Sequence, residues 1–201
     1  MSFMPKLIYL LGCGGHARSV ADVLQNNDPE VELIFIDQNA RDNEIIMGYK
    51  VLKNLPVDAH NLHVASGDSK IRERDFSNRC ITIISKDAYV SNTATILDGV
   101  FIGHFAYIGP EAKIGDGCIL NTRSIIEHEV HVGSFCHISV NSTLCGRVVI
   151  GSHVFVGANT VIKDKICICD DVIIGAGSTV VADIVHPGVY VGNPARFLRK
   201  Y

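Results

Sequence analysis

The sequence lacks any run of apolar residues near the ~20 needed to span a bilayer. Its longest apolar runs, such as the one at residues 7–11, are far shorter than this. No cationic segment followed by an apolar run and a small-residue cleavage site is visible from Met1 to Lys6. These absences predict a protein without membrane insertion and without a secretion signal, and we expect it in the cytoplasm.

An excess of positive charge is also missing. The 201 residues include 18 Lys and Arg against 21 Asp and Glu, for a net charge of −3. Because nucleic-acid binding requires a basic surface, no nucleic-acid partner is expected. The seven cysteines are odd in number and contain no C-x-x-C pair, so we interpret them as reduced and partly buried.

Residues 1–83 alternate strand-like and helix-like segments. An apolar strand at 7–11 leads into a glycine-rich turn at 12–16, and apolar residues then recur at helical spacing from Ala17 to Leu24. The other elements that the pattern predicts are strands at 32–37, 63–66 and 80–84 and a charged helix at 69–76. This order predicts a small, mainly parallel α/β domain that resembles half of a Rossmann fold.

From residue 84 a period of six replaces this alternation. Every sixth residue from 84 to 180 is Ile, Leu or Val, and the residue four places later is never charged or larger than Ile. Such a repeat is typical of a parallel β-helix, in which three hexads form one triangular coil. We predict this β-helix over 84–185, followed by a C-terminal tail at 186–201. Glycine often follows the aliphatic residue, where we expect a tight corner to favour a residue without a Cβ.

Two segments of the β-helix half carry a family resemblance. The tail string Val-Gly-Asn-Pro-Ala-Arg at 191–196, together with residues 121–129 and His137, resembles hexapeptide-repeat acyltransferases. The similar subgroup has a small N-terminal α/β domain and includes sialic acid O-acetyltransferases and nucleotide-4-amino-sugar N-acetyltransferases of the bacillosamine pathway. The resemblance covers nearly the whole chain. It implies a left-handed β-helix, a homotrimer with active sites between subunits, and acetyl-CoA as the co-substrate.

Acyl transfer needs a base near the acceptor atom and a hydrogen-bond donor near the thioester oxygen. His128 is the candidate base, since imidazole titrates at about pH 6.5, and Glu129 is placed to hold one tautomer of its ring. Adjacent strand residues point to opposite faces, so this pairing requires a corner at 128–129. Residues 18 apart stack in consecutive coils. Gly146 therefore lies over His128, and its N–H is the candidate oxyanion donor.

The acetyl donor has a predicted site of its own. The corner at 175–177 stacks on that at 157–159 and forms a thin-walled strip for a pantetheine arm, and the resemblance adds His137. The residues expected to bind acetyl-CoA are His137, Gly146, Ala158, Gly175 and Ala176. No metal is expected, because a carbonic-anhydrase-type site needs two histidines five residues apart and the chain has no such pair.

A second candidate site lies in the α/β domain. Residues 12–17 fit G-x-G-x-x-[GA] between a strand and a helix, where backbone N–H groups bind phosphates. Residues 1–83 hold only half of a dinucleotide fold, so a nucleoside diphosphate is a better match than NAD. The alternative interpretation is a tight strand-to-helix turn that binds no ligand. The resemblance implies a nucleotide-sugar pocket, for which the candidate residues are Gly14, Gly15, His16, Asp37, Asp68 and Arg72.

The leading hypothesis is an acetyl-CoA-dependent N-acetyltransferase. It would act on the 4-amino group of a UDP- or GDP-linked amino-deoxy sugar by direct transfer, with His128 as the general base. An O-acetyltransferase acting on a sialic acid or a related sugar is the alternative, because the hexads do not separate an amine from a hydroxyl acceptor. A non-catalytic trimeric scaffold is the alternative from another class.

Overall fold

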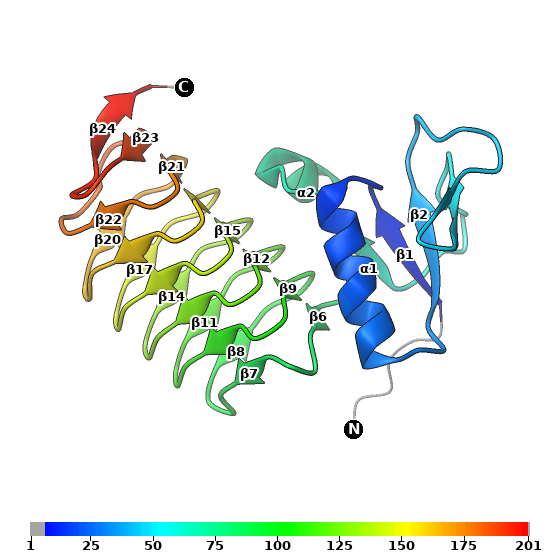
Figure 1. Ribbon diagram of the computed structural model, residues 1–201, viewed down its shortest axis with the longest axis horizontal. Helices are drawn as coiled ribbons and strands as arrows, with labels where there is room; N and C mark the ends of the chain where they lie inside the picture. Colours follow the sequence, from blue (N-terminus) through cyan, green and yellow to red (C-terminus); the bar gives the residue numbers. More distant parts are fainter. Residues whose placement is uncertain (1–6, 201) are drawn as a thin grey trace.

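The computed structural model describes residues 7–200 as an α/β domain followed by a β-solenoid. In Figure 1 the α/β domain is blue to cyan, and the coils run from green near the domain to a red C-terminal hairpin. Residues 1–6, on which the expectation of no secretion signal rests, and Tyr201 lie outside the described residues. Within residues 7–200, none of the helices has the length and apolar content that crossing a bilayer requires.

The α/β domain is built on a five-stranded sheet in the order β3-β4-β2-β1-β5. All neighbours are parallel except β3 and β4, which form a hairpin. The strands are β1 (Leu7–Leu11), β2 (Glu32–Ile36), β3 (Ile45–Ile46), β4 (Tyr49–Leu52) and β5 (Leu62–Val64). The small, mainly parallel α/β domain is thus confirmed, whereas the β3–β4 hairpin is an element that the sequence pattern did not predict.

Two helices complete the domain. Helix α1 (Gly15–Asn27) begins at the glycine-rich turn and buries its apolar stripe, Ala17, Val20, Ala21, Val23 and Leu24. Helix α2 (Ser69–Asp75) begins after Asp68, whose side chain accepts hydrogen bonds from the N–H groups of Lys70 and Ile71. This N-cap satisfies two donors that the first turn of a helix leaves free. Both helices lie where the sequence predicts them.

The solenoid has three faces, whose strands pair with strands 18 residues away. The first face holds β6 (Ile83–Ile84), β9 (Phe101–Ile102), β12 (Ile119–Leu120), β15 (His137–Ile138), β18 (Phe155–Val156), β21 (Val172–Ile174), β23 (Gly188–Val191) and β24 (Arg196–Arg199). The second holds β7 (Tyr89–Val90), β10 (Tyr107–Ile108), β13 (Ile125–Ile126), β16 (Thr143–Leu144), β19 (Val161–Ile162) and β22 (Thr179–Val180). The third holds β8 (Thr95–Ile96), β11 (Lys113–Ile114), β14 (His131–Val132), β17 (Val149–Ile150) and β20 (Cys167–Ile168).

The interior of the solenoid follows the hexad pattern. The aliphatic position is buried in every coil from Ile102 to Val180. At the open end, where no coil lies beneath, Ile84 is 37% exposed. Among the solenoid strands that the structure describes, only β24 runs antiparallel to its neighbour. The predicted left-handed parallel β-helix is therefore confirmed, and its register fixes the position of every corner residue.

The corner glycines are needed because they lack a Cβ, as expected, and not because they adopt the left-handed backbone. The left-handed backbone falls two residues after the glycine position, for example at Phe105 (φ 57°) and Glu129 (φ 58°), and mostly on residues other than glycine. At Gly103, instead, a Cβ would lie 2.8 Å from the backbone nitrogen of Thr122 in the next coil. Glycine is needed there because consecutive coils approach closely, not because the backbone turns.

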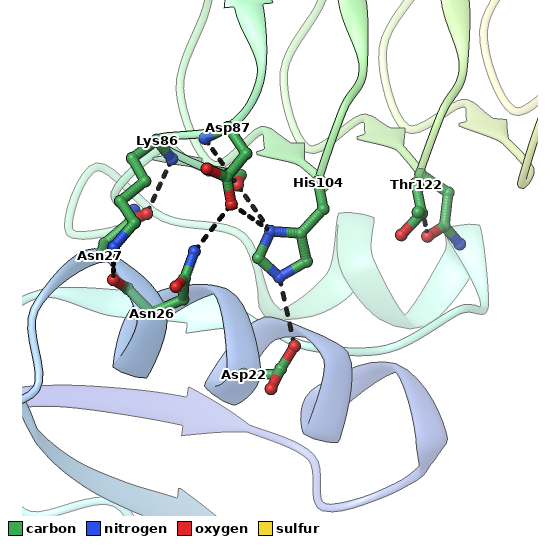
Figure 2. Close-up of polar contacts among 9 residues, drawn as sticks. Asp22, Asn26, Asn27, Lys86, Asp87, His104 and Thr122 are labelled. Carbon is green, nitrogen blue, oxygen red and sulfur yellow. Dashed lines mark hydrogen bonds and ion pairs between the residues drawn. The ribbon is translucent and has the colours of Figure 1, made fainter.

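The α/β domain packs on the first face of the solenoid. Ile83, Phe101 and Ile119 of this face are buried together with the apolar residues of α1 and its sheet. Beside this contact lies a polar cluster that we call the His104 junction, formed by Asp22, Asn26, Asn27, Lys86, Asp87 and His104 (Figure 2). His104 lies between the two carboxylates, 3.2 Å from Asp22 through Nε2 and 3.3 Å from Asp87 through Nδ1.

Candidate active site

His128 lies at the corner between the second and third faces of the solenoid, between β13 and β14. The left-handed conformation of Glu129 turns its side chain back toward the ring, so that Glu129 Oε2 lies 2.9 Å from His128 Nδ1. With Nδ1–H donated to this carboxylate, Nε2 is left as a proton acceptor. The structure thus brings together the two residues that the sequence pairs, through the corner that the pairing requires.

Gly146 lies one coil above this histidine. A Cβ at Gly146 would be 2.5 Å from His128 Nε2, so only glycine leaves room for the ring. Gly146 is buried, yet its N–H donates to no acceptor among residues 7–200. At the same place in other hexads a side chain accepts this bond, as Asp170 Oδ1 does from the Ser152 N–H at 2.7 Å. Buried N–H groups are rarely unpaired, so this one is available to an incoming oxygen.

Three of the residues expected to bind acetyl-CoA, Ala158, Gly175 and Ala176, lie at a different edge of the solenoid from Gly146. Ala158 and Ala176 stack at the corner between the first and second faces, and neither N–H has an acceptor in the described part of the chain. Gly175, beside them, packs closely under the tail, because a Cβ there would lie 2.7 Å from Val191 Cγ1. The second face separates this strip from the His128 corner. One chain alone therefore does not bring His128 and the strip together.

His137 projects from β15 toward the α/β domain, near His16 of α1. Their ring centroids are 6.2 Å apart, and the Asn121 amide lies 3.4 Å from His137 Nε2. Burial, with the charge of Arg72 as a second cause, lowers the pKa of His137 to about 4. Burial likewise lowers the pKa of His16 to about 3, helped by His63 and His137. Both rings are therefore neutral at pH 7.

A cleft of about 910 Å³ opens at the carboxyl ends of β1, β2 and β5. Gly14, Gly15 and His16 line it at the N-terminus of α1, where free N–H groups favour anions, and Asp37 lines it directly after β2. Asp37 accepts hydrogen bonds from the Cys13 thiol at 2.9 Å and from the Asn39 N–H at 2.8 Å. These bonds hold the pKa of Asp37 below its usual value, so it lines the cleft as a carboxylate acceptor.

Two predicted ligands do not reach this cleft. Asp68 caps α2, and Arg72 is buried with its guanidinium bonded to backbone carbonyls. The cations that line the cleft are instead Lys53, Arg74 and Arg79, which the sequence analysis missed. Lys53 directly follows β4, so recognition of the β3–β4 hairpin would have located it.

The cysteines and acidic residues form no further centre. All seven cysteines are free thiols, and Cys118 and Cys136 lie inside the solenoid. Within residues 7–200, no three His, Cys, Asp or Glu side chains are grouped so as to hold a metal ion.

Comparison with known proteins matches both halves of the chain. The PglD N-terminal domain family matches residues 7–78, and the bacterial transferase hexapeptide family (six repeats) matches residues 93–128 and 147–182. No curated protein sequence matches significantly.

Solved structures match over nearly the full length. The acetyltransferase domain of PglB from Neisseria gonorrhoeae FA1090 is 26% identical, with a TM-score of 0.90 over 96% of this chain and 100% of that chain. That domain has also been solved in complex with acetyl coenzyme A. A variant of perosamine N-acetyltransferase from Caulobacter crescentus, in complex with CoA and GDP-perosamine, is 27% identical, with a TM-score of 0.82 over 96% of each chain. WeeI from Acinetobacter baumannii AYE, at 23% identity, a TM-score of 0.88 and coverage of 96% of this chain and 99% of that chain, shares the fold.

These matches agree with the α/β domain and the hexad solenoid. The chain thus combines a PglD-type N-terminal domain with bacterial transferase hexapeptide repeats, and it is an acyltransferase.

Proposed function

We propose that the protein is an acetyl-CoA-dependent N-acetyltransferase acting on the 4-amino group of a UDP- or GDP-linked amino-deoxy sugar, as in the bacillosamine pathway. One observation carries the proposal: Gly146 packs closely against Nε2 of a histidine that Glu129 orients, and its N–H is unpaired among residues 7–200. Support for the substrate class comes from the cleft at the N-terminus of α1 and from the GDP-perosamine complex of the Caulobacter relative.

The chemistry needs few groups. The sugar nitrogen attacks the thioester carbonyl carbon while His128 Nε2 takes the proton that this nitrogen loses. The Gly146 N–H donates to the oxygen as it gains negative charge. The carbon–sulfur bond then breaks, and the CoA thiolate takes the proton back from His128. Glu129 stabilises the imidazolium that forms between these two proton transfers.

The acetyl-CoA arm fits the strip of small residues. The free N–H groups of Ala158 and Ala176 can donate to the amide carbonyls of pantetheine. Gly175 has no side chain and leaves room for the arm beside them. His137 is neutral at pH 7 and lies near the lower end of this strip, where it can contact the acetyl group or the acceptor sugar.

A homotrimer would complete the site. The His128 corner and the strip lie on opposite edges of the second face. They meet only where the His128 corner of one subunit lies beside the strip of the neighbouring subunit. The second face is apolar enough to be covered, because its outward residues include Tyr89, Tyr107, Ile125 and Val161, of which Tyr89 is 60% exposed. We propose that this face is the subunit interface.

The cleft would hold the nucleotide. The N–H groups of Gly14 and Gly15 would bind the diphosphate, and the Asp37 carboxylate would accept from a ribose hydroxyl or a base N–H. His16, between the cleft and His137, would face the sugar. We therefore propose residues 1–83 as the nucleotide-sugar domain, 84–185 as the acyltransferase domain and 186–201 as the tail that closes the solenoid.

A substrate panel tests the proposal. Acetyl-CoA would be offered with UDP- and GDP-linked 4-amino sugars and with free sialic acid, while released thiol is measured and the product is identified by mass spectrometry. We expect amide formation with a nucleotide-linked amino sugar. Acetylation of sialic acid alone would support the O-acetyltransferase alternative, and thiol release with no acceptor in the panel would contradict both.

A further inference from the structure

Arg72 is the largest fully buried side chain among residues 7–200, at 2% exposure. Its five N–H groups all donate to backbone carbonyls: Nε to Gly117 at 2.8 Å, Nη1 to Ser66 and Gly67 at 3.0 and 2.9 Å, and Nη2 to Phe135 and Cys136 at 2.6 and 3.2 Å. No carboxylate among residues 7–200 forms an ion pair with it. Five carbonyl dipoles therefore replace the hydration of a buried charge, and a guanidinium has no further donor.

The five carbonyls come from two regions that the chain separates widely. Ser66 and Gly67 follow β5 and line the cleft of the α/β domain. Gly117, Phe135 and Cys136 belong to the solenoid corner between the third and first faces, and Cys136 directly precedes His137. A single planar group thus fixes a wall of the cleft against the coil that carries His137. A lysine has a point charge and cannot reproduce this fork.

The His104 junction makes a contrast within the same interface (Figure 2). It also joins the α/β domain to the solenoid, but through side chains of α1 that are largely at the surface, such as Asp22 at 66% exposure. None of its six residues lines the cleft. Loss of this junction would weaken domain docking without moving the Ser66–Gly67 wall.

We propose that Arg72 is a positioning residue for acyl transfer, which sets the cleft wall at Ser66–Gly67 in register with the coil of His137. This inference rests on the proposed function for its substrate. Its physical basis is that a nucleotide held by the cleft presents its sugar toward the solenoid only if the cleft wall and this coil keep a fixed separation. The charge of Arg72 also affects this coil, because it lowers the pKa of His137 and so helps to keep that ring neutral.

The test compares Arg72→Lys and Arg72→Met with His104→Ala as the matched control. For the Arg72 variants we expect the KM for the nucleotide sugar to rise about tenfold or more, since small displacements of a bound substrate are costly, while the KM for acetyl-CoA stays nearly constant. Hydrogen exchange of the Ala65 amide, which is buried next to this wall and donates to the Leu11 carbonyl, should accelerate in these variants alone. In His104→Ala both KM values and the exchange at Ala65 should match the wild type.

Other outcomes separate this inference from the proposed function. If Arg72→Lys folds and leaves the KM for the nucleotide sugar unchanged, or if His104→Ala raises it equally, the positioning role is overturned. If the wild type transfers no acetyl group, the proposed function fails. The positioning role of Arg72 is then tested by calorimetric measurement of UDP and GDP binding. Weaker binding of either in the Arg72 variants would support the inference, and equal binding or none to the wild type would overturn it.

Discussion

The His128 corner and the cleft of the α/β domain are held in place by different means. At the corner, backbone hydrogen bonds fix both sides: the Glu129 N–H donates to Pro110 in the coil below, and the Arg147 N–H in the coil above donates to His128. The cleft is formed by loops after β1, β2, β4 and β5, and its shape depends on side chains such as Cys13, Asp37 and Arg72. Rigid coils thus carry the groups proposed for chemistry, and loops carry those proposed for recognition.

This difference predicts how substitutions divide between the two regions. A change at the corner removes an interaction that forms only in the transition state, and it should lower kcat. A change in the cleft removes binding that is present before and during reaction, and it should raise the KM for the nucleotide sugar. Each prediction below can break that division or sharpen it.

The largest effect is expected at the base. His128→Ala should lower kcat by about 10²-fold or more, because general-base catalysis is lost while the coil stays intact. His131→Ala is the matched control, since His131 is an exposed histidine on the neighbouring face. Steady-state kinetics of both variants would check this. Near-normal turnover in His128→Ala would remove the corner from the mechanism.

The next effect is expected at Gly146→Ala. The new Cβ would take the space of His128 Nε2 and displace a ring whose side chain is 46% exposed and free to swing outward. We expect kcat to fall by about 10²-fold while the melting temperature changes little. A crystal structure of the variant would show the displaced ring. Unchanged kcat with the ring displaced would mean that the position of Nε2 does not matter.

A smaller effect of the other kind is expected at Asp37→Asn. This change keeps the size of the side chain but removes its charge and one of its two acceptor oxygens, so the KM for the nucleotide sugar should rise about tenfold with kcat nearly constant. Asp58→Asn, at an exposed position outside the cleft, is the control. If Asp37→Asn lowered kcat instead, the division between the two regions would fail.

The buried histidines are expected to have the smallest effect on activity at neutral pH. Their effect on stability at lower pH should be measurable. Burial lowers the pKa of His16 to about 3 and those of His63 and His137 to about 4. Below about pH 6.5 the unfolded chain therefore binds more protons, so stability is complete above that pH and is lost toward pH 4. Each histidine contributes up to about 1.4 kcal/mol per pH unit.

Urea unfolding at several pH values checks this linkage. The free energy of unfolding of the wild type should fall steadily from pH 6.5 to pH 4.5. His63→Gln, which removes one of the titrating groups, should show a shallower slope over the same range. A wild-type stability that is flat across this range would mean that these rings are not held neutral by burial.

The solenoid could be predicted almost residue by residue from the sequence. The hexad period fixes which residues are 18 apart, and the stacking of Gly146 on His128 follows by counting. The hexad period did not predict the backbone conformation at the corner. The left-handed residue is Glu129 rather than a glycine, because the clash that excludes a Cβ and the turn that reverses the chain occur at different places in the hexad.

The α/β domain was less predictable. The β3–β4 hairpin has a short-range signal, because Met47 and Gly48 both adopt positive φ between two strands and X-Gly turns favour hairpins. Arg72 has no such signal. Its partners at Gly117 and Phe135 are 45 and 63 residues away, so its burial depends on how the domain docks on the solenoid. Local patterns cannot contain that information.

The most direct test is the rate of acetyl transfer with both substrates at saturating concentration. Wild type and His128→Ala would be mixed with acetyl-CoA and a UDP- or GDP-linked 4-amino sugar, and the acetylated sugar would be followed by mass spectrometry. The account predicts rapid formation of an N-acetyl product by the wild type and a rate lower by about 10²-fold or more in the variant. Equal rates in the two proteins would contradict it.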